Sequence, residues 1–411
     1  MTIVANISKH DTLSRRFNNY DARLSLLKYG IDSKFICWTK PMGPPHYSQQ
    51  AKSTWWSQWT PQLAKYGRAT GNINGYYRNA SAITSLDFYK TADVLHFHIV
   101  HDEYLSLRDW RLIGKSKPLV WTWHDPYMFS GHCIYSLDCT RFESGCQTCP
   151  HLDYYFPIAK DRSAKNLAER FIAVQKLDPL VIVASEYMQD LLMRSVYKDK
   201  VRKRKLHFGI QIPNPISQIE ARAKLHIPKE NIVIGFRATS SPFKGMPLIL
   251  DSLKKFAHKN PGIPLTIITF DHLDCCKDLP GNWQLIEAGW VHGDEINDYY
   301  ASMDYFLMPS RAEAFGLMAI EALACGATPL VTNGTSLPPL VGAPSIGRSC
   351  DHELNDYYEM LESALLTSEL NKQGRQDRIN YAHDQYRIDK FSSEMAQIYQ
   401  EEIEYFKSKR T

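Results

Sequence analysis

The chain alternates short apolar, β-branched runs with segments of helical periodicity along its whole length, a pattern typical of parallel α/β construction. In the first half the predicted strands are Ile3–Ile7, Lys34–Trp38, Val94–His98, Leu119–Trp123 and Leu180–Ala184. A second series follows, with strands predicted at Asn231–Phe236, Leu265–Thr269, Trp283–Ile286, Tyr305–Met308 and Thr328–Val331. Pro213-Asn214-Pro215 separates the two series. We interpret it as a linker, because proline disfavours helix at its own position and at the residue before it.

The 411 residues exceed the usual size of a single hydrophobic core, so we expect two domains. The pattern predicts a first α/β domain over residues 1–212, a second over residues 213–388 and a C-terminal helix over residues 389–411. Within the first domain, Arg16–Tyr29 has the spacing of an amphipathic helix, and Pro41–Asn79 is predicted to be a long excursion with little periodicity. Two α/β domains of similar size suit a ligand held in a cleft between them.

Composition excludes several classes of protein. No apolar run approaches the roughly 18 residues that a membrane helix needs, and the amino terminus lacks the apolar core of a signal peptide. The 48 Lys and Arg residues against 44 Asp and Glu give a net charge of +4, too weak a bias to indicate nucleic-acid binding by composition. We therefore expect a cytoplasmic protein.

The most informative motif is SRAEAFGLMAIEALACG, in which Glu313 and Glu321 lie eight residues apart. A strand is predicted just before it and Leu317–Ala324 is helical by composition, so Gly316 lies near a helix start. Glu313 then lies in a loop beyond a strand's carboxyl end, and Glu321 more than one turn inside the helix. Free backbone N–H groups at a helix start attract anionic or hydroxyl-rich ligands, and a carboxylate on each side can bind sugar hydroxyls. The alternative is an exposed Glu followed by a Glu on a helix face.

A second motif is GFRATSSPFKG, in which Arg237 and Lys244 flank a short polar loop. A predicted strand ends near Phe236, and a helix follows the loop. Two cations held around a loop and a helix start suit a diphosphate leaving group, because they neutralise the charge that grows as a glycosidic bond breaks. The alternative is a solvated loop, since an Arg and a Lys seven residues apart are common on protein surfaces.

A third motif is WTWHDPYMFSGHC, which follows directly from the predicted strand Leu119–Trp123. His124 and Asp125 fall at the carboxyl end of that strand, where open α/β sheets place their binding sites. A single histidine in such a position is more often structural than functional. The pair of His124 with Asp125 is the feature that favours a functional interpretation.

The three motifs together resemble the retaining family-four glycosyltransferases of the GT-B fold, and the resemblance spans nearly the whole chain. It implies two Rossmann-like domains facing across a cleft, with the C-terminal helix crossing back to the first domain. It implies that Glu313 contacts the donor sugar and that Glu321 binds the ribose hydroxyls of the nucleotide. It also implies a diphosphate-binding pair in Arg237 and Lys244, a first-domain histidine that reaches the donor sugar in His124, and backbone donors to sugar and phosphate in Phe315, Gly316 and Leu317.

The segment HDPYMFSGHCIYSLDCTRFESGCQTCP is similar to a subgroup that makes bacterial surface polysaccharides and carries the same four-cysteine loop. Its cysteines are Cys133, Cys139, Cys146 and Cys149, within a loop that we place at residues 126–161. Four thiolates in a short loop can close a tetrahedral structural zinc site, although the spacing departs from paired Cys-x2-Cys knuckles. An iron–sulfur cluster and unligated thiols stay open as alternatives. Four thiolates would leave no open position for a substrate, so a metal here would fold the loop.

Three further features are less specific. Relatives place a glycine-rich turn after the first strand, where this chain has Thr12-Leu13-Ser14-Arg15, and Ser14 or Arg15 could substitute at a helix start. The basic run Lys198–Lys205 is interpreted as a solvated loop or helix end. Tryptophans that sit among Lys52, Lys65 and Arg68 form a mixture that can lie at a membrane surface. We expect either that role, or a cap on the first domain's core or cleft, for Trp55, Trp56 and Trp59.

We therefore expect a hexosyltransferase-type enzyme that uses a nucleotide-sugar, UDP- or GDP-activated, without a catalytic metal. The resemblance implies retention of anomeric configuration and an acceptor that is a glycan or lipid-linked oligosaccharide of a surface polysaccharide. Peripheral contact at the inner face of the membrane is a separate expectation. One rival is a nucleotide-sugar isomerase on the same architecture, for which we identify no additional acid–base set. A non-enzymatic rival is a nucleic-acid-binding protein that uses the cysteine loop and the basic run, which would leave the paired glutamates unexplained.

Overall fold

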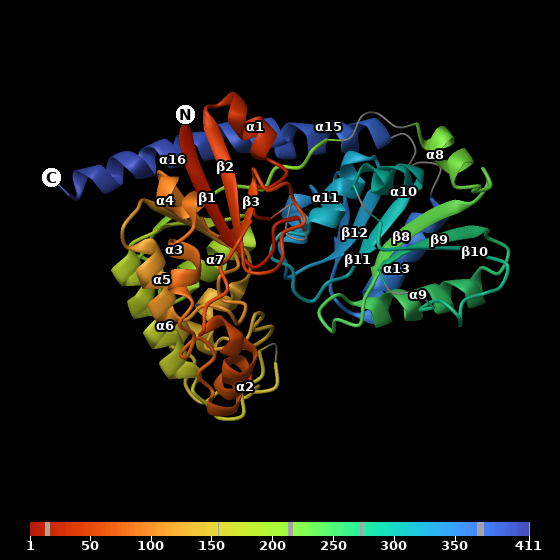
Figure 1. Cartoon of the computed structure of the whole chain (residues 1–411). Coiled ribbons are helices and arrows are strands. Elements are labelled where there is room, and N and C mark those ends of the chain that lie inside the picture. Colours follow the sequence, from red (N-terminus) through yellow and green to blue (C-terminus); the bar gives the residue numbers. More distant parts are fainter. Residues whose placement is uncertain are drawn as a thin grey trace. The chain divides into compact units, whose positions relative to one another are not determined.

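A computed structural model describes residues 1–12, 17–154, 156–212, 217–271, 274–291, 293–367 and 374–410. The chain forms two compact units, one of Met1–Ile210 with Ile388–Thr411 and the other of Gln211–Arg387 (Figure 1). The predicted linker Pro213-Asn214-Pro215 lies outside the described residues, as do Ser14 and Arg15.

The first unit is built on a seven-stranded sheet in which all paired neighbours are parallel. Its strand order is β3-β2-β1-β4-β5-β6-β7. The strands are β1 (Thr2–Ser8), β2 (Ile31–Cys37), β3 (Ser48–Gln50), β4 (Val94–Phe97), β5 (Leu119–Trp123), β6 (Leu180–Val183) and β7 (Arg202–Lys205). All five strands predicted for this half are present. Short β3 lies inside the segment predicted as an excursion, and it extends the sheet beyond β2.

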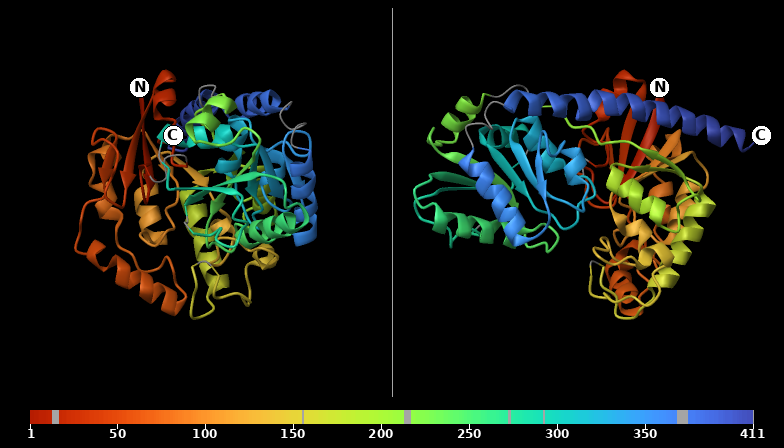
Figure 2. Two further views of the ribbon diagram at one scale, coloured as in Figure 1. Left: turned by 90° about the vertical axis from the view of Figure 1, so that its right-hand side faces the viewer. Right: turned by 180° about the vertical axis from the view of Figure 1, so that it is seen from behind.

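Helices and loops connect the strands of the first unit. Its α-helices are α1 (Arg23–Lys28), α2 (Thr60–Thr70), α3 (Ala80–Thr84), α4 (Asp87–Thr91), α5 (Leu107–Gly114), α6 (Ser163–Leu177), α7 (Glu186–Arg194) and α16 (Ile388–Ser408). Short 3-10 turns are η2 (Ser57–Trp59), η3 (Pro126–Phe129) and η4 (Arg141–Ser144). Although α16 closes the sequence, it packs on α1, β4 and β5 of the first unit, as the ribbons in Figure 2 show.

The second unit has a six-stranded parallel sheet of order β10-β9-β8-β11-β12-β13. Its strands are β8 (Ile232–Ala238), β9 (Leu265–Asp271), β10 (Gln284–Gly289), β11 (Tyr305–Met308), β12 (Thr328–Thr332) and β13 (Arg348–Cys350). Its helices are α8 (Gln218–Lys224), α9 (Met246–Lys259), α10 (Ile296–Ser302), α11 (Leu317–Ala324), α12 (Leu337–Leu340), α13 (Leu354–Leu366) and α15 (Arg375–Tyr386), with the 3-10 turn η5 (Gly293–Glu295). Helices α9 and α13 share one apolar core with the sheet, and α8, α10 and α11 share the other.

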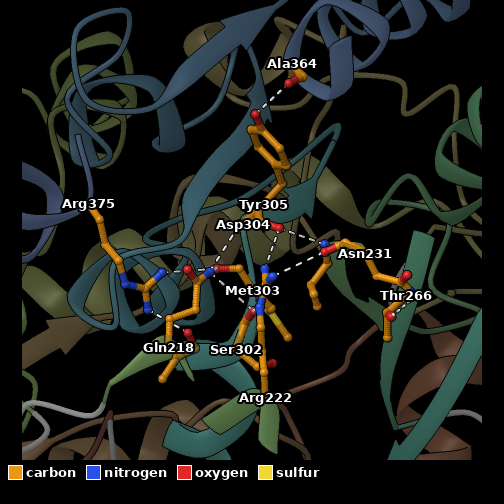
Figure 3. Close-up of polar contacts among 12 residues, drawn as sticks. Gln218, Arg222, Asn231, Thr266, Ser302, Met303, Asp304, Tyr305, Ala364 and Arg375 are labelled. Carbon is orange, nitrogen blue, oxygen red and sulfur yellow. Dashed lines mark hydrogen bonds and ion pairs between the residues drawn. The ribbon is translucent and has the colours of Figure 1, made fainter. Parts of the chain in front are cut away.

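A buried polar network holds α8 to the amino ends of β8 and β11 (Figure 3). Asp304 precedes β11, and its carboxylate accepts hydrogen bonds from the Arg222 guanidinium at 2.7 Å and from the backbone N–H of Val233 at 2.8 Å. Arg222 also donates to the carbonyl oxygens of Ser302 and Asn231, at 3.0 and 3.2 Å. Both ends of this ion pair are buried, but the charges and donors are matched, which is the condition under which a buried charge is tolerated.

Two local predictions differ from the structure. Arg16 lies outside the described residues, and over residues 17–29 the predicted helix is confined to α1, because Asn18 uses its side-chain amide to donate to the carbonyls of His10 and Asp11 at 2.9 and 2.8 Å. Side-chain bonds of this kind compete with helix formation. The basic run Lys198–Lys205 ends in strand β7 rather than in a solvated loop or a helix end. Its charges are balanced there by carboxylates, with Arg202 bound to Glu402 at 2.7 Å.

No helix among the described residues combines the length and the apolar character that crossing a bilayer requires.

Candidate active site

The second unit brings together two loops that are far apart in sequence. Strands β8 and β11 are neighbours in the sheet although β9 and β10 intervene in the chain, so the strand order reverses between them. Such a switch point, at the carboxyl ends of the strands, is where open α/β sheets bind ligands. The loop after β8 leads to α9 and the loop after β11 leads to α11. The backbone N–H of Arg311 donates to the carbonyl of Phe243 at 2.8 Å and joins the two loops.

Two glycines allow these loops to pack closely. Gly245 caps α9 with a φ of +69°, and a Cβ at this position would lie 1.9 Å from the carbonyl oxygen of Pro309. Gly316 caps α11 with a φ of +87°, and a Cβ there would lie 2.2 Å from the Leu337 side chain. Both backbone conformations favour glycine, so neither position accepts a larger residue without a shift of the loop.

The consequence of this packing is a contact between Lys244 and Glu313. The Lys244 ammonium donates to a Glu313 carboxylate oxygen at 2.5 Å, and the two side chains are 24% and 12% exposed. The two residues come from different sequence motifs, 69 positions apart. A mostly buried but still partly exposed cation next to a carboxylate, at a switch point, can bind a ligand that carries both negative charge and hydroxyl groups.

Glu321 is the fifth residue of α11, more than one helical turn after Gly316. One of its carboxylate oxygens accepts a hydrogen bond from the Tyr300 hydroxyl at 3.4 Å. The side chains of Phe315 and Leu317 are buried in the unit, so these residues can offer a ligand only their backbone groups. As the first residue of α11, Leu317 has a backbone N–H that no carbonyl of the helix can accept.

Arg237 is less closely associated with this cluster. It lies within β8, next to the strand's last residue, and its guanidinium binds the Asp271 carboxylate at the end of β9 at 2.8 Å. Its side chain is about half exposed. In the structure Lys244 thus contacts Glu313 directly. Arg237, on β8, instead pairs with a different carboxylate, that of Asp271.

In the first unit, His124 follows directly after β5 and belongs to a chain of buried polar side chains. Its Nε2 lies 3.0 Å from Nδ1 of His98, and Nε2 of His98 lies 3.1 Å from Oδ1 of Asn6. The Asn6 side chain is oriented by its amide nitrogen, which donates to the carbonyl of Lys34 at 3.2 Å. The His124 ring also stacks on Phe208, with ring centroids 5.3 Å apart.

This chain of partners determines the tautomers of both histidines. Because Oδ1 of Asn6 can only accept, Nε2 of His98 carries the proton and donates it. A neutral His98 then has a bare Nδ1, which accepts from Nε2–H of His124. Nδ1 of His124 is left as an unprotonated acceptor. It is inaccessible to solvent and meets no hydrogen-bond partner in the described part of the chain.

Burial keeps these rings neutral. It lowers the pKa of His124 to about 3, because the effect of burial exceeds the opposing attraction of the Asp125 charge. Burial also lowers the pKa of His98 well below the ordinary range, and the charges of His96 and His124 add to this shift. Asp125 itself pairs with Nε2 of His101 at 3.3 Å. Although burial alone would raise its pKa, the charge of His101 and a hydrogen bond from it lower the pKa of Asp125.

A histidine within β4, His96, links this region to the C-terminal helix. Nδ1 of His96 lies 2.8 Å from the hydroxyl of Tyr399 on α16, and Nε2 lies 2.7 Å from the Thr122 hydroxyl. The amide of Asn19 donates to the Tyr399 hydroxyl at 3.1 Å. Sequence reasoning missed the roles of His96 and His98. Two histidines with strand periodicity in an otherwise apolar run were the available signal, since they point to one face of the sheet.

The cysteine loop places its four thiols near one another without a shared centre. Burial raises the pKa of Cys133 to about 11, and the charges of Cys149 and Cys139 add to this effect. Burial likewise raises the pKa of Cys146 to about 12. Cys139 lines a pocket of about 350 Å³. Across the described residues, no three His, Cys, Asp or Glu side chains are grouped as metal ligands. The donor set suits zinc by its chemistry, but the side chains are not arranged as a ligand shell.

Comparison with known proteins agrees with the geometry of the second unit. The family described as "Glycosyl transferases group 1" matches residues 217–384, which contain both loops of the switch point. The chain belongs to this family. The putative colanic acid biosynthesis glycosyl transferase WcaC of Escherichia coli K12 is 24% identical over 290 residues, 64% of this chain and 64% of WcaC. The chain thus spans less than two thirds of that relative's length.

Two further comparisons extend over more of the chain. An uncharacterised 41.2 kDa protein in the cps region of Klebsiella pneumoniae is 30% identical over 302 residues, 70% of this chain and 75% of that protein. The structure of Anabaena Alr3699/HepE in complex with UDP and glucose matches 97% of this chain and 99% of its own, with a TM-score of 0.61 at 14% identity. The two parallel α/β units form the GT-B fold of glycosyltransferase structures, as the sequence predicted.

Proposed function

We propose that this protein transfers a sugar from a nucleotide-sugar to a glycan or lipid-linked glycan acceptor in the synthesis of a surface polysaccharide. The observation that carries the proposal is the contact of Lys244 with Glu313 at the switch point between β8 and β11. A cation there can stabilise a leaving diphosphate, and the adjacent carboxylate can bind hydroxyls of the sugar. The matches to WcaC and to a protein of a cps region support the polysaccharide context.

In this proposal, different residues of the second unit bind different parts of the nucleotide-sugar donor. Lys244 and Arg237 bind the diphosphate, and binding it releases each from part of its present carboxylate contact. Glu313 accepts hydrogen bonds from the sugar, and Glu321 accepts them from the ribose. Phe315, Gly316 and Leu317 contribute backbone N–H groups at the start of α11.

The reaction that we propose retains the anomeric configuration and uses no catalytic metal. The bond between the anomeric carbon and the diphosphate oxygen breaks, and its electron pair leaves with the diphosphate. The acceptor hydroxyl forms the new bond on the same face of the sugar. Its proton passes to an oxygen of the departing phosphate. Lys244 lowers the barrier because the negative charge on that phosphate increases as the bond breaks.

His124 has a separate role in the proposal. Its bare Nδ1 is a buried acceptor without a partner among the described residues, and in the proposal a local shift uncovers it so that it accepts a hydrogen bond from a hydroxyl of the donor sugar. Because burial keeps the ring neutral, the contact persists at neutral pH. The ring therefore orients the sugar and does not act as a general acid.

The nucleotide is the least constrained part of the proposal. Both UDP- and GDP-sugars carry the diphosphate and the ribose that these residues would bind. The complex of Alr3699/HepE with UDP and glucose supports a uridine nucleotide. We also propose that the four cysteines of the loop hold one structural zinc, whose chemistry would be limited to folding the loop.

Calorimetric titration with UDP, GDP and dTDP, and with their sugars, tests the proposal. We expect one nucleotide series to bind, and we expect Glu313→Gln to weaken the intact donor more than the free diphosphate. Glu321→Gln should weaken both ligands. Equal losses in the two variants would contradict the division of roles. If the protein converts one nucleotide-sugar into another and transfers no sugar to an acceptor, the isomerase is favoured. If only RNA or DNA raises its thermal stability, the nucleic-acid-binding alternative is favoured.

A further inference from the structure

Three tryptophans form an exposed cluster on the first unit. Trp55, Trp56 and Trp59 are 63%, 45% and 47% exposed. Their rings contact one another edge to face, with centroids 4.7 Å apart for Trp55 and Trp56 and 6.3 Å apart for Trp55 and Trp59. With these exposed fractions the three tryptophans are not part of the buried core of the first domain, and a cap on that core or on the cleft stays a prediction. Water-exposed tryptophans that touch each other are costly to maintain without a partner, because each presents a large apolar surface.

The turn that carries the cluster is held in place by hydrogen bonds. The backbone N–H of Thr54 donates to the Ser57 hydroxyl oxygen at 2.8 Å, and the backbone N–H of Ser57 donates to the Thr54 hydroxyl oxygen at 3.1 Å. At the other end, the Thr60 hydroxyl accepts from the buried Asn79 amide at 3.1 Å. Asn79 also donates to the carbonyl of Tyr104 at 2.8 Å, inside the unit. The rings are thus presented on an ordered segment, which lowers the entropy lost when they bind.

The charge of the surrounding segment has a single sign. From residue 33 to residue 86 the chain has no Asp or Glu, and its cations are Lys34, Lys40, Lys52, Lys65, Arg68 and Arg78. Two of them, Lys34 and Arg68, pair with carboxylates from outside this stretch, Asp32 and Glu103. The other four are exposed, and no carboxylate among the described residues pairs with them. Lys52 and Lys65 flank the tryptophan cluster in sequence.

We propose that this surface, formed by Trp55, Trp56 and Trp59 with Lys52 and Lys65, docks on an anionic phospholipid bilayer. Tryptophan rings favour the headgroup region, where an apolar ring and a polar N–H are both accommodated. Unpaired lysines next to them are attracted to negative headgroups. Since no described helix can cross a bilayer, the contact is peripheral. The inference goes beyond glycosyl transfer and does not depend on it.

A carbohydrate partner fits the same surface less well. Stacking on a sugar needs an open aromatic face, and a chain of sugars needs several faces in one plane. Here the planes of Trp55 and Trp56 are inclined by 80°, and those of Trp55 and Trp59 by 60°. Rings inclined in this way form a wedge, which suits insertion between headgroups. The Lys52 ammonium donates to the carbonyl of Ser85 at 3.4 Å but has no carboxylate partner in the described part of the chain, so the charges of Lys52 and Lys65 have no counterpart on a neutral glycan.

Sedimentation with vesicles tests the proposal on the full chain. The probes are vesicles of phosphatidylcholine alone and vesicles with about one third phosphatidylglycerol. We expect binding to the anionic vesicles that is at least about tenfold weaker in the triple variant W55A/W56A/W59A. Lys52→Gln with Lys65→Gln should weaken binding to the anionic vesicles and reduce its dependence on salt. Trp290→Ala is the matched control, because Trp290 is 60% exposed in the second unit.

Several results would overturn the proposal. They are absence of binding to anionic vesicles by the unaltered protein, and unchanged binding by the triple variant. The single variant Trp55→Ala serves if the triple variant fails to fold, since it removes the most exposed ring; it should weaken binding, and an unchanged affinity would count against the surface. Electrophoresis in gels that contain dextran or alginate tests the carbohydrate alternative. If these gels retard the protein, if the retardation depends on the tryptophans and if the protein does not bind vesicles, then the partner of this surface is a glycan and not a bilayer.

Discussion

Nδ1 of His98 lies 3.0 Å from Nε2 of His124, and the partner on the far side of His98 determines which ring carries the proton between them. Asn6 accepts from His98, His98 accepts from His124, and the remaining nitrogen of His124 is left as a bare acceptor. The orientation of His124 is therefore set by Asn6 on β1 and by His98 directly after β4, two strands whose positions depend on the whole first sheet. His98 is in this sense a positioning residue.

Substitutions of His98 test that role. In His98→Gln, the amide oxygen can accept from His124 while the amide nitrogen donates to Asn6, so most activity should remain. His98→Leu removes both bonds and should lower turnover by roughly 100-fold, the scale expected for a misplaced group at a site. Steady-state kinetics of both variants, with thermal unfolding as a check on folding, measure the difference. Equal losses of activity in the two variants would reduce His98 to a packing role.

The buried histidines also predict how stability depends on pH. The pKa values of His96, His98 and His124 are lowered below the ordinary 6.5, so these rings stay neutral in the folded protein. In the unfolded chain they bind protons once the pH falls below about 6.5, and stability decreases in that range. Each ring contributes a slope of up to about 1.4 kcal/mol per pH unit. Between pH 6 and pH 5, His98→Gln should lose less stability than the unaltered protein, as urea unfolding at each pH would show. Parallel curves would contradict a neutral His98.

The contact of Lys244 with Glu313 predicts a large kinetic effect. Lys244→Ala should lower turnover by roughly 100- to 1,000-fold, because a donor to the leaving diphosphate is lost. The matched control is Lys254→Ala, which removes an exposed lysine on α9 that pairs with Asp278. Arg237→Ala should also lower turnover. Near-normal rates in both Lys244→Ala and Arg237→Ala would contradict the proposal that these two residues bind the diphosphate.

The sequence predicted much of the second unit because its signals there are local. Strand Tyr305–Met308 and helix Leu317–Ala324 have the predicted ends, since an apolar run and a glycine mark each boundary. Strand β7 was missed because its four residues are all basic. It is a strand because its backbone pairs in parallel with β6, and its charge is balanced in part by Glu402, which lies 200 positions after Arg202 on α16. No local pattern contains that partner.

The same distinction applies to the site. The motifs identified Lys244 and Glu313 separately, but their contact depends on β8 lying beside β11 in the sheet. Strand order is a property of the whole unit, so spacing along the chain could not give the contact. The tautomer of His124 likewise depends on Asn6, which lies more than a hundred positions earlier and belongs to a strand with no functional motif.

The Arg222–Asp304 ion pair should matter for stability and not for chemistry. It lies at the amino ends of the strands, at the opposite edge of the sheet from the two loops. Arg222→Met should cost about 3–5 kcal/mol, because Asp304 would remain buried and charged without its partner. Lys224→Ala on the same helix removes an exposed pair with Asp298 and should cost much less. Denaturant titration measures both. Similar losses in the two variants would contradict the importance of burial.

The last prediction concerns the four-cysteine loop. If Cys133, Cys139, Cys146 and Cys149 hold one zinc, elemental analysis should find about one equivalent in the purified protein. Metal binding would draw the thiols together and deprotonate them, against the burial that raises the pKa of Cys133 and Cys146. Chelation should then lower the thermal stability of the first unit and expose the loop to proteases. Cys37→Ser is a control outside the loop, at a buried thiol. Metal-free protein with four titratable loop thiols and full stability would reject the zinc, and a coloured protein would indicate an iron–sulfur cluster instead.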